Sequence, residues 1–198
     1  MRSSFQDVLL SIDGTDRERI DVHVVSDLRT AVSAELELTL YRFNGSVLRE
    51  WTYPVELGAD SAAIVFSSPV ADLLEGQGSS DVVLEICLQA NGQMIDRKVH
   101  YFVPEKEIPL QRSVITVTET PDSGSLSFSV TSDVLARGVY LTSEDEGIFS
   151  YNYFDLLPGQ SKTIVFSQRG GDGRDWIPAI PKGLKVQSMV DYVSEDLL

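Results

Sequence analysis

The chain has 198 residues, of which 42% are hydrophobic, and a formal charge of −14 from 16 Lys and Arg against 30 Asp and Glu. This length allows one large domain or two ordinary domains, and the hydrophobic fraction is sufficient to build compact cores. Because the acidic residues are spread along the chain and no basic stripe is present, the composition disfavours a nucleic-acid partner and an anionic membrane surface.

The sequence carries no sign of a membrane span or a disulfide framework. No apolar run approaches the roughly 18 residues that indicate a membrane helix, and the first four residues open no hydrophobic signal-peptide core. We therefore expect no membrane partner, and the start of the chain is typical of a fragment. The single cysteine, Cys87, rules out an intramolecular disulfide and a cysteine-based zinc cluster, so we expect a buried or half-buried strand thiol.

Alternation of apolar and polar residues, which is typical of half-buried strands, dominates the first half of the chain. The clearest runs cover residues 7–12, 20–25, 35–41, 47–53, 81–89 and 93–102. Asn44-Gly45 separates the third run from the fourth, and Asn91-Gly92 separates the last two. Such pairs accept positive φ in tight hairpins. Residues 70–74 are the one short helical candidate, and they predict a turn that crosses between two sheets.

Two prolines, Pro104 and Pro109, bracket residues 105–108. Because proline cannot donate to a sheet ladder, such a pair is typical of a strand end or a linker. We therefore predict a first domain over residues 1–107 and a second over residues 108–198.

Further strands are predicted after this boundary, at a spacing of roughly ten residues, with Gly, Pro and Asp between them. They cover residues 113–118, 125–130, 139–141, 161–166 and 184–188. The sequence therefore predicts an all-β chain that forms two tandem immunoglobulin-like antiparallel β-sandwich domains.

Two stretches of the second half are more specific, ARGVYL at residues 136–141 and YNYFDLLPG at residues 151–159. In the second stretch Pro158-Gly159 predicts a hairpin turn, and the carboxylate of Asp155 is expected to accept hydrogen bonds from nearby backbone N–H groups. The apolar members are candidate core residues, namely Phe154, Leu156 and Leu157. With the connector YFVPEKE at residues 101–107, these stretches resemble the penultimate and last β-sandwich domains of β-mannosidases of glycoside hydrolase family two.

The resemblance covers nearly the whole chain and implies a parent enzyme that hydrolyses terminal non-reducing β-D-mannose residues with retention. Such enzymes use two glutamates on a (β/α)₈ barrel, and nothing in this sequence corresponds to that barrel. The resemblance therefore implies non-catalytic C-terminal accessory domains, with no catalytic residue, no cofactor and no hydrolytic activity of their own. Their implied partner is the catalytic barrel of the same parent chain. Related exo-acting galactosidases and glucosaminidases of this family also carry sandwich domains.

Four aromatic residues are candidates for contact with carbohydrate or with a partner domain: Trp176, Tyr151, Tyr153 and Trp51. Aromatic faces present broad apolar area, on which the apolar face of a sugar ring can stack. Trp51 alternates with neighbouring apolar residues, which favours a strand position, whereas Trp176 follows a glycine-rich stretch that predicts an enlarged loop over residues 168–176.

Two alternatives to the accessory role stay open. A carbohydrate-binding module would hold mannose-containing glycans by aromatic stacking and raise the local enzyme concentration, and it requires an exposed aromatic platform. An adhesive scaffold unrelated to glycosidases requires a continuous apolar patch for a different partner.

Other polar clusters favour structural interpretations. Residues 144–146 (Glu-Asp-Glu) indicate a solvated loop. Residues 170–175 match one copy of a glycine-rich calcium repeat, but a single copy lacks the neighbouring coil, so a flexible glycine loop is favoured. His23 and His100 lie apart within predicted strands, which disfavours a catalytic triad and a histidine metal site. We predict no metal site.

Overall fold

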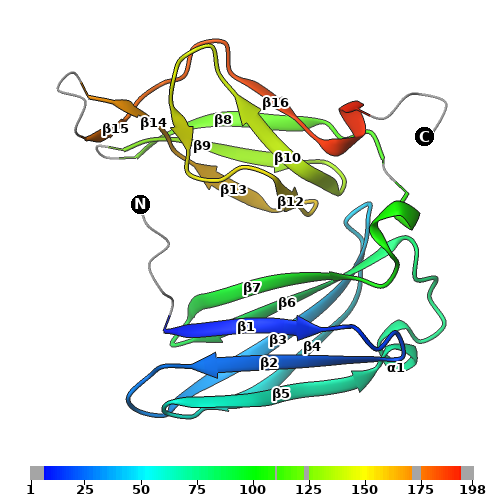
Figure 1. Ribbon diagram of the computed structural model, residues 1–198. Coiled ribbons are helices and arrows are strands. Elements are labelled where there is room, and N and C mark those ends of the chain that lie inside the picture. The colour runs from blue at the N-terminus through cyan, green and yellow to red at the C-terminus, as the bar shows by residue number, and fades with distance from the viewer. Residues whose placement is uncertain (1–6, 110, 123–124, 171–174, 193–198) are drawn as a thin grey trace. The chain divides into compact units, whose positions relative to one another are not determined.

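The structure is a computed structural model that describes residues 7–109, 111–122, 125–170 and 175–192. The chain divides into two compact units after Ile108, and the hairpin tip Phe43–Gly45 groups with the second unit. Within the described ranges, every strand pairing is antiparallel. The predicted all-β, immunoglobulin-like class is therefore confirmed (Figure 1).

The first unit is built from two sheets. One has the order β1-β2-β5 and contains β1 (Val8–Asp13), β2 (Arg19–Ser26) and β5 (Ser61–Pro69). The other has the order β4-β3-β6-β7 and contains β3 (Val32–Arg42), β4 (Val47–Leu57), β6 (Val82–Ala90) and β7 (Gln93–Tyr101). The predicted helical crossing between the sheets is α1 (Val70–Leu74), which follows β5, and a 3₁₀ turn at Glu105–Glu107 follows β7.

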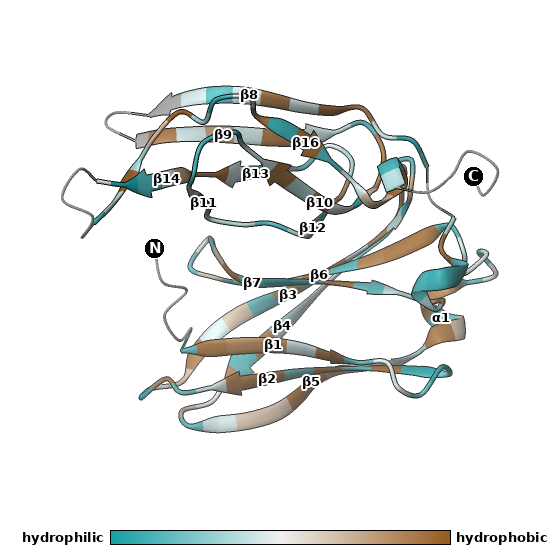
Figure 2. Ribbon diagram, turned by 45° about the horizontal axis from the view of Figure 1, so that its top comes forward, coloured by the Kyte–Doolittle hydropathy of each residue, from teal (hydrophilic) through white to brown (hydrophobic). Residues whose placement is uncertain are grey.

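The core of the first unit forms because alternation along β1, β2 and β3 sends one face of each strand inward, whereas β6 is buried at every position over residues 82–88. On β3 the inward residues include Leu36, Leu38 and Leu40, all fully buried. They stand directly opposite Leu88, Ile86 and Leu84 of β6. This leucine-rich centre joins the inward residues of β1 and β2 in a single cluster, and Figure 2 shows hydrophobic segments recurring along these strands.

Strand β5 is absent from the predictions because its sequence begins with small residues that do not alternate in polarity. It nevertheless pairs along the whole of β2, from Arg19↔Pro69 to Ser26↔Ser61. Pairing with a neighbour supplies its backbone hydrogen bonds, so tertiary context overrides weak local preference.

The hairpin at Asn91-Gly92 is confirmed, with φ of 53° at Asn91 and 72° at Gly92 between the paired strands β6 and β7. Positive φ at both central residues is the conformation for which Asn-Gly is selected. At the other predicted turn, Gly45 has φ of 89°, and the N–H of Arg42 donates to the carbonyl of Ser46 at 2.9 Å.

The second unit consists of shorter strands in three small sheets. The sheet β13-β9-β8 contains β8 (Ile115–Asp122), β9 (Ser125–Ser132) and β13 (Ser161–Ile164). The sheet β12-β10-β16 contains β10 (Ala136–Thr142), β12 (Phe154–Leu156) and β16 (Lys185–Gln187). The sheet β11-β14-β15 contains β11 (Ile148–Phe149), β14 (Phe166–Arg169) and β15 (Trp176–Pro178), and a 3₁₀ turn, η2 (Met189–Tyr192), follows β16.

Two predictions about strand connections are wrong. Residues 161–166 do not form one strand, because β13 and β14 are interrupted at Val165 and belong to different sheets. Pro158-Gly159 does form a turn, with φ of 75° at Gly159 and Gln160 N–H donating to the Leu157 carbonyl at 3.2 Å. That turn leads from β12 to β13, which lie in different sheets, so it is not a hairpin. Pro-Gly specifies the bend but not which strands pair.

The predicted enlarged loop over residues 168–176 is also wrong at both ends. Gln168 and Arg169 belong to β14 and pair with Ile177 and Trp176 of β15. The N–H of Gly170 donates to the carbonyl of Asp175 at 2.8 Å, which continues the hairpin. Residues 171–174, on which the calcium alternative depended, lie outside the described residues.

Candidate functional site

The two motifs that carry the family resemblance are paired strands. ARGVYL forms β10, YNYFDLLPG contains β12, and the two strands pair as Ala136↔Leu156 and Val139↔Phe154 with a bulge between. Gly138 occupies the bulge with φ of 56°. The Asp155 carboxylate accepts the Gly138 N–H at 2.8 Å and the Arg137 Nε–H at 3.4 Å. The prediction that Asp155 binds backbone donors is therefore confirmed.

Three tyrosine rings, which we call the tyrosine row, lie side by side above this strand pair. The rings of Tyr153 and Tyr140 are stacked, with centroids 5.6 Å apart and planes 16° apart. On the other side of Tyr140, the Tyr192 ring lies at 5.7 Å with a tilt of 34°. The two outer residues are strongly exposed, Tyr153 at 78% and Tyr192 at 65%. The row is therefore an aromatic surface open to solvent.

Polar contacts beneath the row hold it in place. The Gln187 Oε1 accepts the hydroxyls of Tyr140 at 3.0 Å and Tyr192 at 3.3 Å. Tyr153 itself has φ of 58°, which is unfavourable for a bulky residue. Its neighbour Asn152 spans the backbone of Leu141, since Oδ1 accepts the Leu141 N–H at 2.7 Å and Nδ2 donates to the Leu141 carbonyl at 3.1 Å. Together with Asp155, Asn152 fixes the backbone on both sides of Tyr153.

Tyr151 and Trp176 are exposed but lie outside the row, and each has a cation over its ring. The Lys162 ammonium lies 4.0 Å from the Tyr151 ring centroid, and the Arg169 guanidinium lies 5.5 Å from that of Trp176. Such contacts occupy part of an aromatic face. Trp176 begins β15, and Figure 1 shows this strand at the opposite end of the second unit from the red turn η2. Tyr192 is the last residue of that turn. Trp176 and the tyrosine row are therefore separate surfaces.

Trp51 belongs to the first unit and faces inward. It lies on β4 opposite Leu38 and packs against the core cluster, while the Arg49 guanidinium lies 4.9 Å from its ring centroid. Its alternation with other apolar residues therefore reflects core packing. The structure does not bring the four predicted aromatic residues together.

Sequence reasoning missed Tyr140, Tyr192 and Gln187. The pairing Tyr140↔Gln187 between β10 and β16 joins positions that are far apart in the sequence. Only knowledge of this register could have identified the row.

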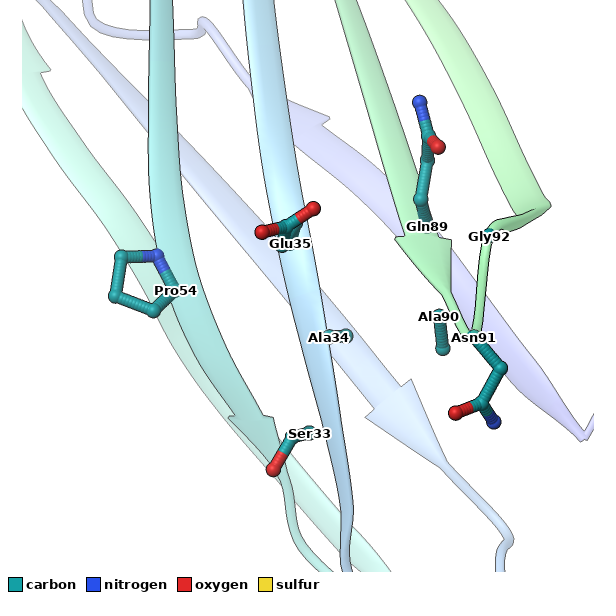
Figure 3. Close-up of a pocket in the computed structure, with 8 residues that line it drawn as sticks. All are labelled: Ser33, Ala34, Glu35, Pro54, Gln89, Ala90, Asn91 and Gly92. Carbon is teal, nitrogen blue, oxygen red and sulfur yellow. The ribbon is translucent and has the colours of Figure 1, made fainter.

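An open groove of about 330 Å³ lies on the first unit. It crosses the end of the four-stranded sheet where β3 begins and the β6–β7 turn lies (Figure 3). Its polar lining comes from Ser33, Glu35, Gln89 and Asn91.

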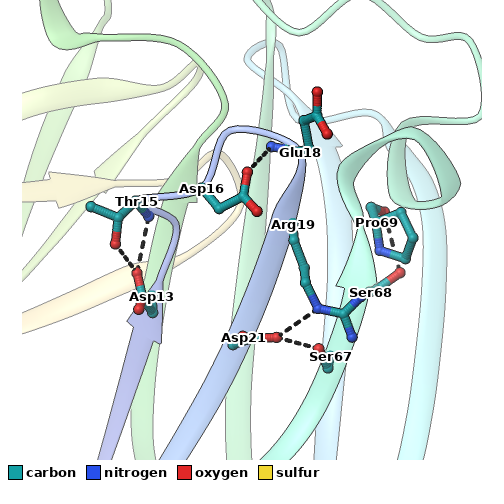
Figure 4. A network of polar contacts seen from close by, with 9 residues as sticks. All are labelled: Asp13, Thr15, Asp16, Glu18, Arg19, Asp21, Ser67, Ser68 and Pro69. Carbon is teal, nitrogen blue, oxygen red and sulfur yellow. Dashed lines mark hydrogen bonds and ion pairs between the residues drawn. The ribbon is translucent and has the colours of Figure 1, made fainter.

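The network of polar contacts drawn in Figure 4 has a structural role. Asp13 accepts the N–H and the hydroxyl of Thr15, and these hydrogen bonds hold the pKa of its carboxyl below the ordinary value. Asp16 accepts the Glu18 N–H at 2.9 Å. Asp21 accepts from Arg19 and from the Ser67 hydroxyl. These contacts close the β1–β2 turn and the end of the β2–β5 pair.

A buried charged group lies on the outer side of β6. Glu85, 5% exposed, pairs with Arg97 at 2.5 Å and accepts the Tyr41 hydroxyl at 3.2 Å. Burial, with the Glu85 charge nearby, raises the pKa of the Cys87 thiol to about 12. Cys87 is therefore the inert buried thiol expected from the sequence. Burial also lowers the pKa of His100 from its usual 6.5.

Within the described ranges, no group of three or more His, Cys, Asp and Glu side chains could hold a metal ion. The same residues include no helix that is long and apolar enough to cross a membrane.

Comparison with known families accounts for both units. A model described as a mannosidase Ig/CBM-like domain matches residues 18–107, and a model described as an Ig-fold domain of the mannosidase type matches residues 110–192.

Two curated relatives are β-mannosidase A of Aspergillus clavatus and of Neosartorya fischeri. The first is 27% identical over 177 residues, covering 81% of this chain and 19% of the relative. The second is 24% identical over 194 residues, covering 90% of this chain and 20% of the relative. The chain thus spans about a fifth of the length of the relatives it matches.

Solved structures show the same fold. A β-D-mannosidase from Dictyoglomus thermophilum matches with a TM-score of 0.70 at 20% identity, covering 93% of this chain and 22% of that one. An exo-chitosanase from Amycolatopsis orientalis matches with a TM-score of 0.55 at 14% identity, covering 92% and 26%. Residues 18–107 therefore match a mannosidase Ig/CBM-like domain and residues 110–192 an Ig-fold domain, and the chain resembles the sandwich domains of glycoside hydrolases of the β-mannosidase family.

Proposed function

We propose that the two sandwiches are non-catalytic accessory domains of a β-mannosidase-like glycoside hydrolase, with the first domain at residues 1–107 and the second at residues 108–198. Their partner is the catalytic barrel of the same parent chain, which hydrolyses terminal non-reducing β-D-mannose residues with retention. One observation carries the proposal: the two mannosidase-type domain models follow each other along the chain from residue 18 to residue 192. The curated relatives that match by sequence are β-mannosidases about five times as long as this chain.

The chemistry of the described residues supports a role without catalysis. A retaining glycosidase needs two carboxyl groups about 5–5.5 Å apart across the sugar, one protonated and one ionised. Here the closely placed carboxylates bind neighbouring hydroxyl, guanidinium and backbone groups, as Asp13, Asp21 and Glu85 do. These contacts stabilise strand ends and turns, so the carboxylates serve the fold.

The proposal is tested in two steps. The purified chain is assayed with p-nitrophenyl β-D-mannopyranoside beside a preparation of the Glu35→Gln, Glu85→Gln double variant, and both should release nitrophenol at the background rate. Turnover by the unaltered chain that the double variant lacks would overturn the non-catalytic role. The parent enzyme is then expressed with and without these two domains, and the shortened form should lose thermal stability. An unchanged melting temperature would overturn the supporting role.

The tyrosine row favours a second candidate, a carbohydrate-binding module that acts by aromatic stacking. Tyr153 keeps an unfavourable backbone conformation and a largely exposed ring, and retained strain of this kind is found at binding sites. Titration with mannose, mannobiose and longer manno-oligosaccharides should then give saturable binding that Tyr153→Ala abolishes. Trp176→Ala and Tyr151→Ala provide comparisons at the two other exposed rings, and Trp51→Ala at the inward-facing ring.

A further inference from the structure

The turn between β6 and β7 presents Asn91 and Gly92 to solvent. Both residues are exposed, both have positive φ, and a Cβ built on Gly92 would meet no atom within 4 Å. Figure 3 shows the Asn91 carboxamide projecting past the end of β6. The side chain of Asn91 and the backbone nitrogen of Gly92 are therefore accessible to water and are not confined by packing.

Neither of these two groups is held by a hydrogen bond. Within the part of the chain that the structure describes, the Asn91 carboxamide and the Gly92 N–H have no hydrogen-bond partner. The turn consists of only these two residues between the pair Ala90↔Gln93, so its conformation can change without breaking a side-chain contact. Local opening of an exposed turn costs little free energy. The Asn91 side chain can therefore rotate until its Cγ approaches the Gly92 nitrogen.

The other two asparagines of the chain are held differently. The carboxamide of Asn152 bonds both backbone groups of Leu141, at 2.7 and 3.1 Å, and a bulky residue follows it in the sequence. Asn44 also precedes a glycine, but Gly45 is half-buried, and Asn44 has an interaction partner in the folded chain. Of these three asparagines, all of which lie within the described ranges, only Asn91 combines an exposed following glycine with an unbonded carboxamide.

This arrangement favours a reaction within the chain. A bond between a backbone nitrogen and the side-chain carbonyl carbon of the preceding asparagine closes a five-membered ring, and glycine has no Cβ to hinder the nitrogen. Two reacting groups on adjacent residues also have a high effective concentration. We propose that Asn91 is a spontaneous modification site, at which the folded chain deamidates with water as the co-reactant. The proposal does not rest on the accessory role.

The atoms balance over two steps. The Gly92 backbone nitrogen loses its proton and bonds to the Asn91 Cγ, the Cγ–Nδ2 bond breaks, and Nδ2 takes up a proton and leaves as ammonia. Water then opens the cyclic imide at one of its two carbonyls. Breaking the new N–Cγ bond gives aspartate, and breaking the original peptide bond gives isoaspartate, in which the backbone runs through Cγ. No oxidant or reductant takes part.

The two products should differ in their effect on the first unit. Aspartate keeps the two-residue turn, because Asp-Gly also accepts positive φ. Isoaspartate lengthens the backbone of the turn by one carbon, and in a hairpin the loop length sets the register of the strands. At this turn β7 pairs with β6, which is buried at every position over residues 82–88. The isoaspartyl form should therefore exchange the amide hydrogens at the start of β7 faster than the aspartyl form.

The test follows the reaction in the folded chain and in the chain unfolded in guanidinium chloride, at the same mildly alkaline pH. Samples are quenched with acid and digested, and mass spectrometry detects the replacement of NH₂ by OH in each peptide. In the unfolded chain both Asn-Gly pairs should react at similar rates, because only the local sequence matters there. In the folded chain Asn91 should react within about tenfold of its unfolded rate, and Asn44 about tenfold or more slowly than Asn91.

Two variants assign the site. Asn91→Gly keeps the left-handed backbone of the turn and should abolish the mass increase of the folded chain. The matched control is Asn44→Gly, which removes the asparagine of the other Asn-Gly pair and should leave the mass increase unchanged. The rate at Asn91 should also rise with pH, because the attacking nitrogen must lose its proton.

Three results would overturn the proposal. In the first, Asn91 stays unmodified in the folded chain under conditions in which it reacts in the unfolded chain. In the second, Asn44 reacts in the folded chain as fast as Asn91 does. In the third, the folded Asn91→Gly variant retains the mass increase. None of these outcomes depends on whether the two domains support a catalytic barrel.

Discussion

The two sandwiches are stabilised in different ways. In the first, long paired strands produce one broad aliphatic cluster. In the second, the sheets are only three strands wide and the cluster is smaller. There, side chains also hydrogen-bond to the backbone of β10. Asn152 bonds the backbone of Leu141, and Asp155 accepts the Gly138 N–H.

This difference indicates which kind of substitution should destabilise each unit. A core that depends on burial loses stability mainly when volume is removed, whereas a fold that depends on a few polar contacts loses it when a single acceptor is removed. The exposed tyrosine row lies on the second kind of framework. Its geometry is set by directional bonds rather than by tight packing.

The largest effects are expected from core truncation, which should separate the two units. Leu84→Ala in the first core and Leu141→Ala in the second remove buried side chains, and each should lower the free energy of unfolding by about 2–5 kcal/mol. Urea unfolding is followed by tryptophan fluorescence, with Trp51 reporting on the first unit in Trp176→Phe and Trp176 on the second in Trp51→Phe. Reaction of the Cys87 thiol with a disulfide reagent gives an independent signal for the first unit.

Each truncation should move only the transition of its own unit. If Leu84→Ala shifted the fluorescence of Trp176 as much as that of Trp51, the two sandwiches would unfold as one cooperative body. The two units would then have no separate free energies of unfolding to compare.

Removal of the Asp155 acceptor should be the next largest effect. Asp155→Ala leaves the Gly138 N–H and the buried Arg137, which is 7% exposed, without this acceptor. The expected loss is about 2–4 kcal/mol. Asp155→Asn keeps one acceptor oxygen and should cost about 1–2 kcal/mol. Equal losses in both variants, measured by the Trp176 signal, would show that charge alone matters.

A smaller effect should follow from His100 in the first unit. Burial lowers its folded pKa below 6.5, so the unfolded chain binds more protons as pH falls. The stability contribution is therefore present above pH 6.5 and is lost as pH falls below it. His100→Gln should flatten this part of the stability curve, while His23→Gln should leave it in place. An unchanged slope in His100→Gln would contradict the assignment.

The smallest effect is expected at Tyr153. Asparagine tolerates the left-handed backbone better than tyrosine does, so Tyr153→Asn offsets the lost ring stacking by relieving strain. The net change in the free energy of unfolding should stay within about 1 kcal/mol. Tyr153→Val, which is β-branched, should be clearly less stable than Tyr153→Asn. Equal stabilities would mean that the backbone relaxes freely at this position.

Much of the first sandwich was predictable because its strands are long and alternate regularly. Its central strands and one hairpin were predicted from the runs over residues 35–41 and 81–89 and from the Asn91-Gly92 turn. Strand β5 was not predictable, since the pattern of a strand rich in serine and alanine exists only in its pairing with β2. In the second sandwich, strands of three or four residues are too short for a period to be recognised, as β14 and β15 show.

Candidate site residues were predictable only as residue types. The aromatic residues could be named from the sequence, but their exposure depends on the face of the sheet on which each side chain lies. Trp51 packs against the core, whereas Tyr153 is exposed to solvent. The groove was not foreseen because its residues come from three strands and a turn that only the register assembles.

The contact of Asp96 with strand β1 has a further consequence. Its carboxylate accepts the Leu10 N–H at 3.1 Å, on the edge of β1 that has no strand partner among the described residues. An unpaired strand edge can accept a strand from another molecule. Because Asp96 of β7 already accepts the Leu10 N–H, one of the donors that an added strand would need is occupied. A side chain of one sheet thereby completes a hydrogen bond that the edge strand of the other sheet leaves open.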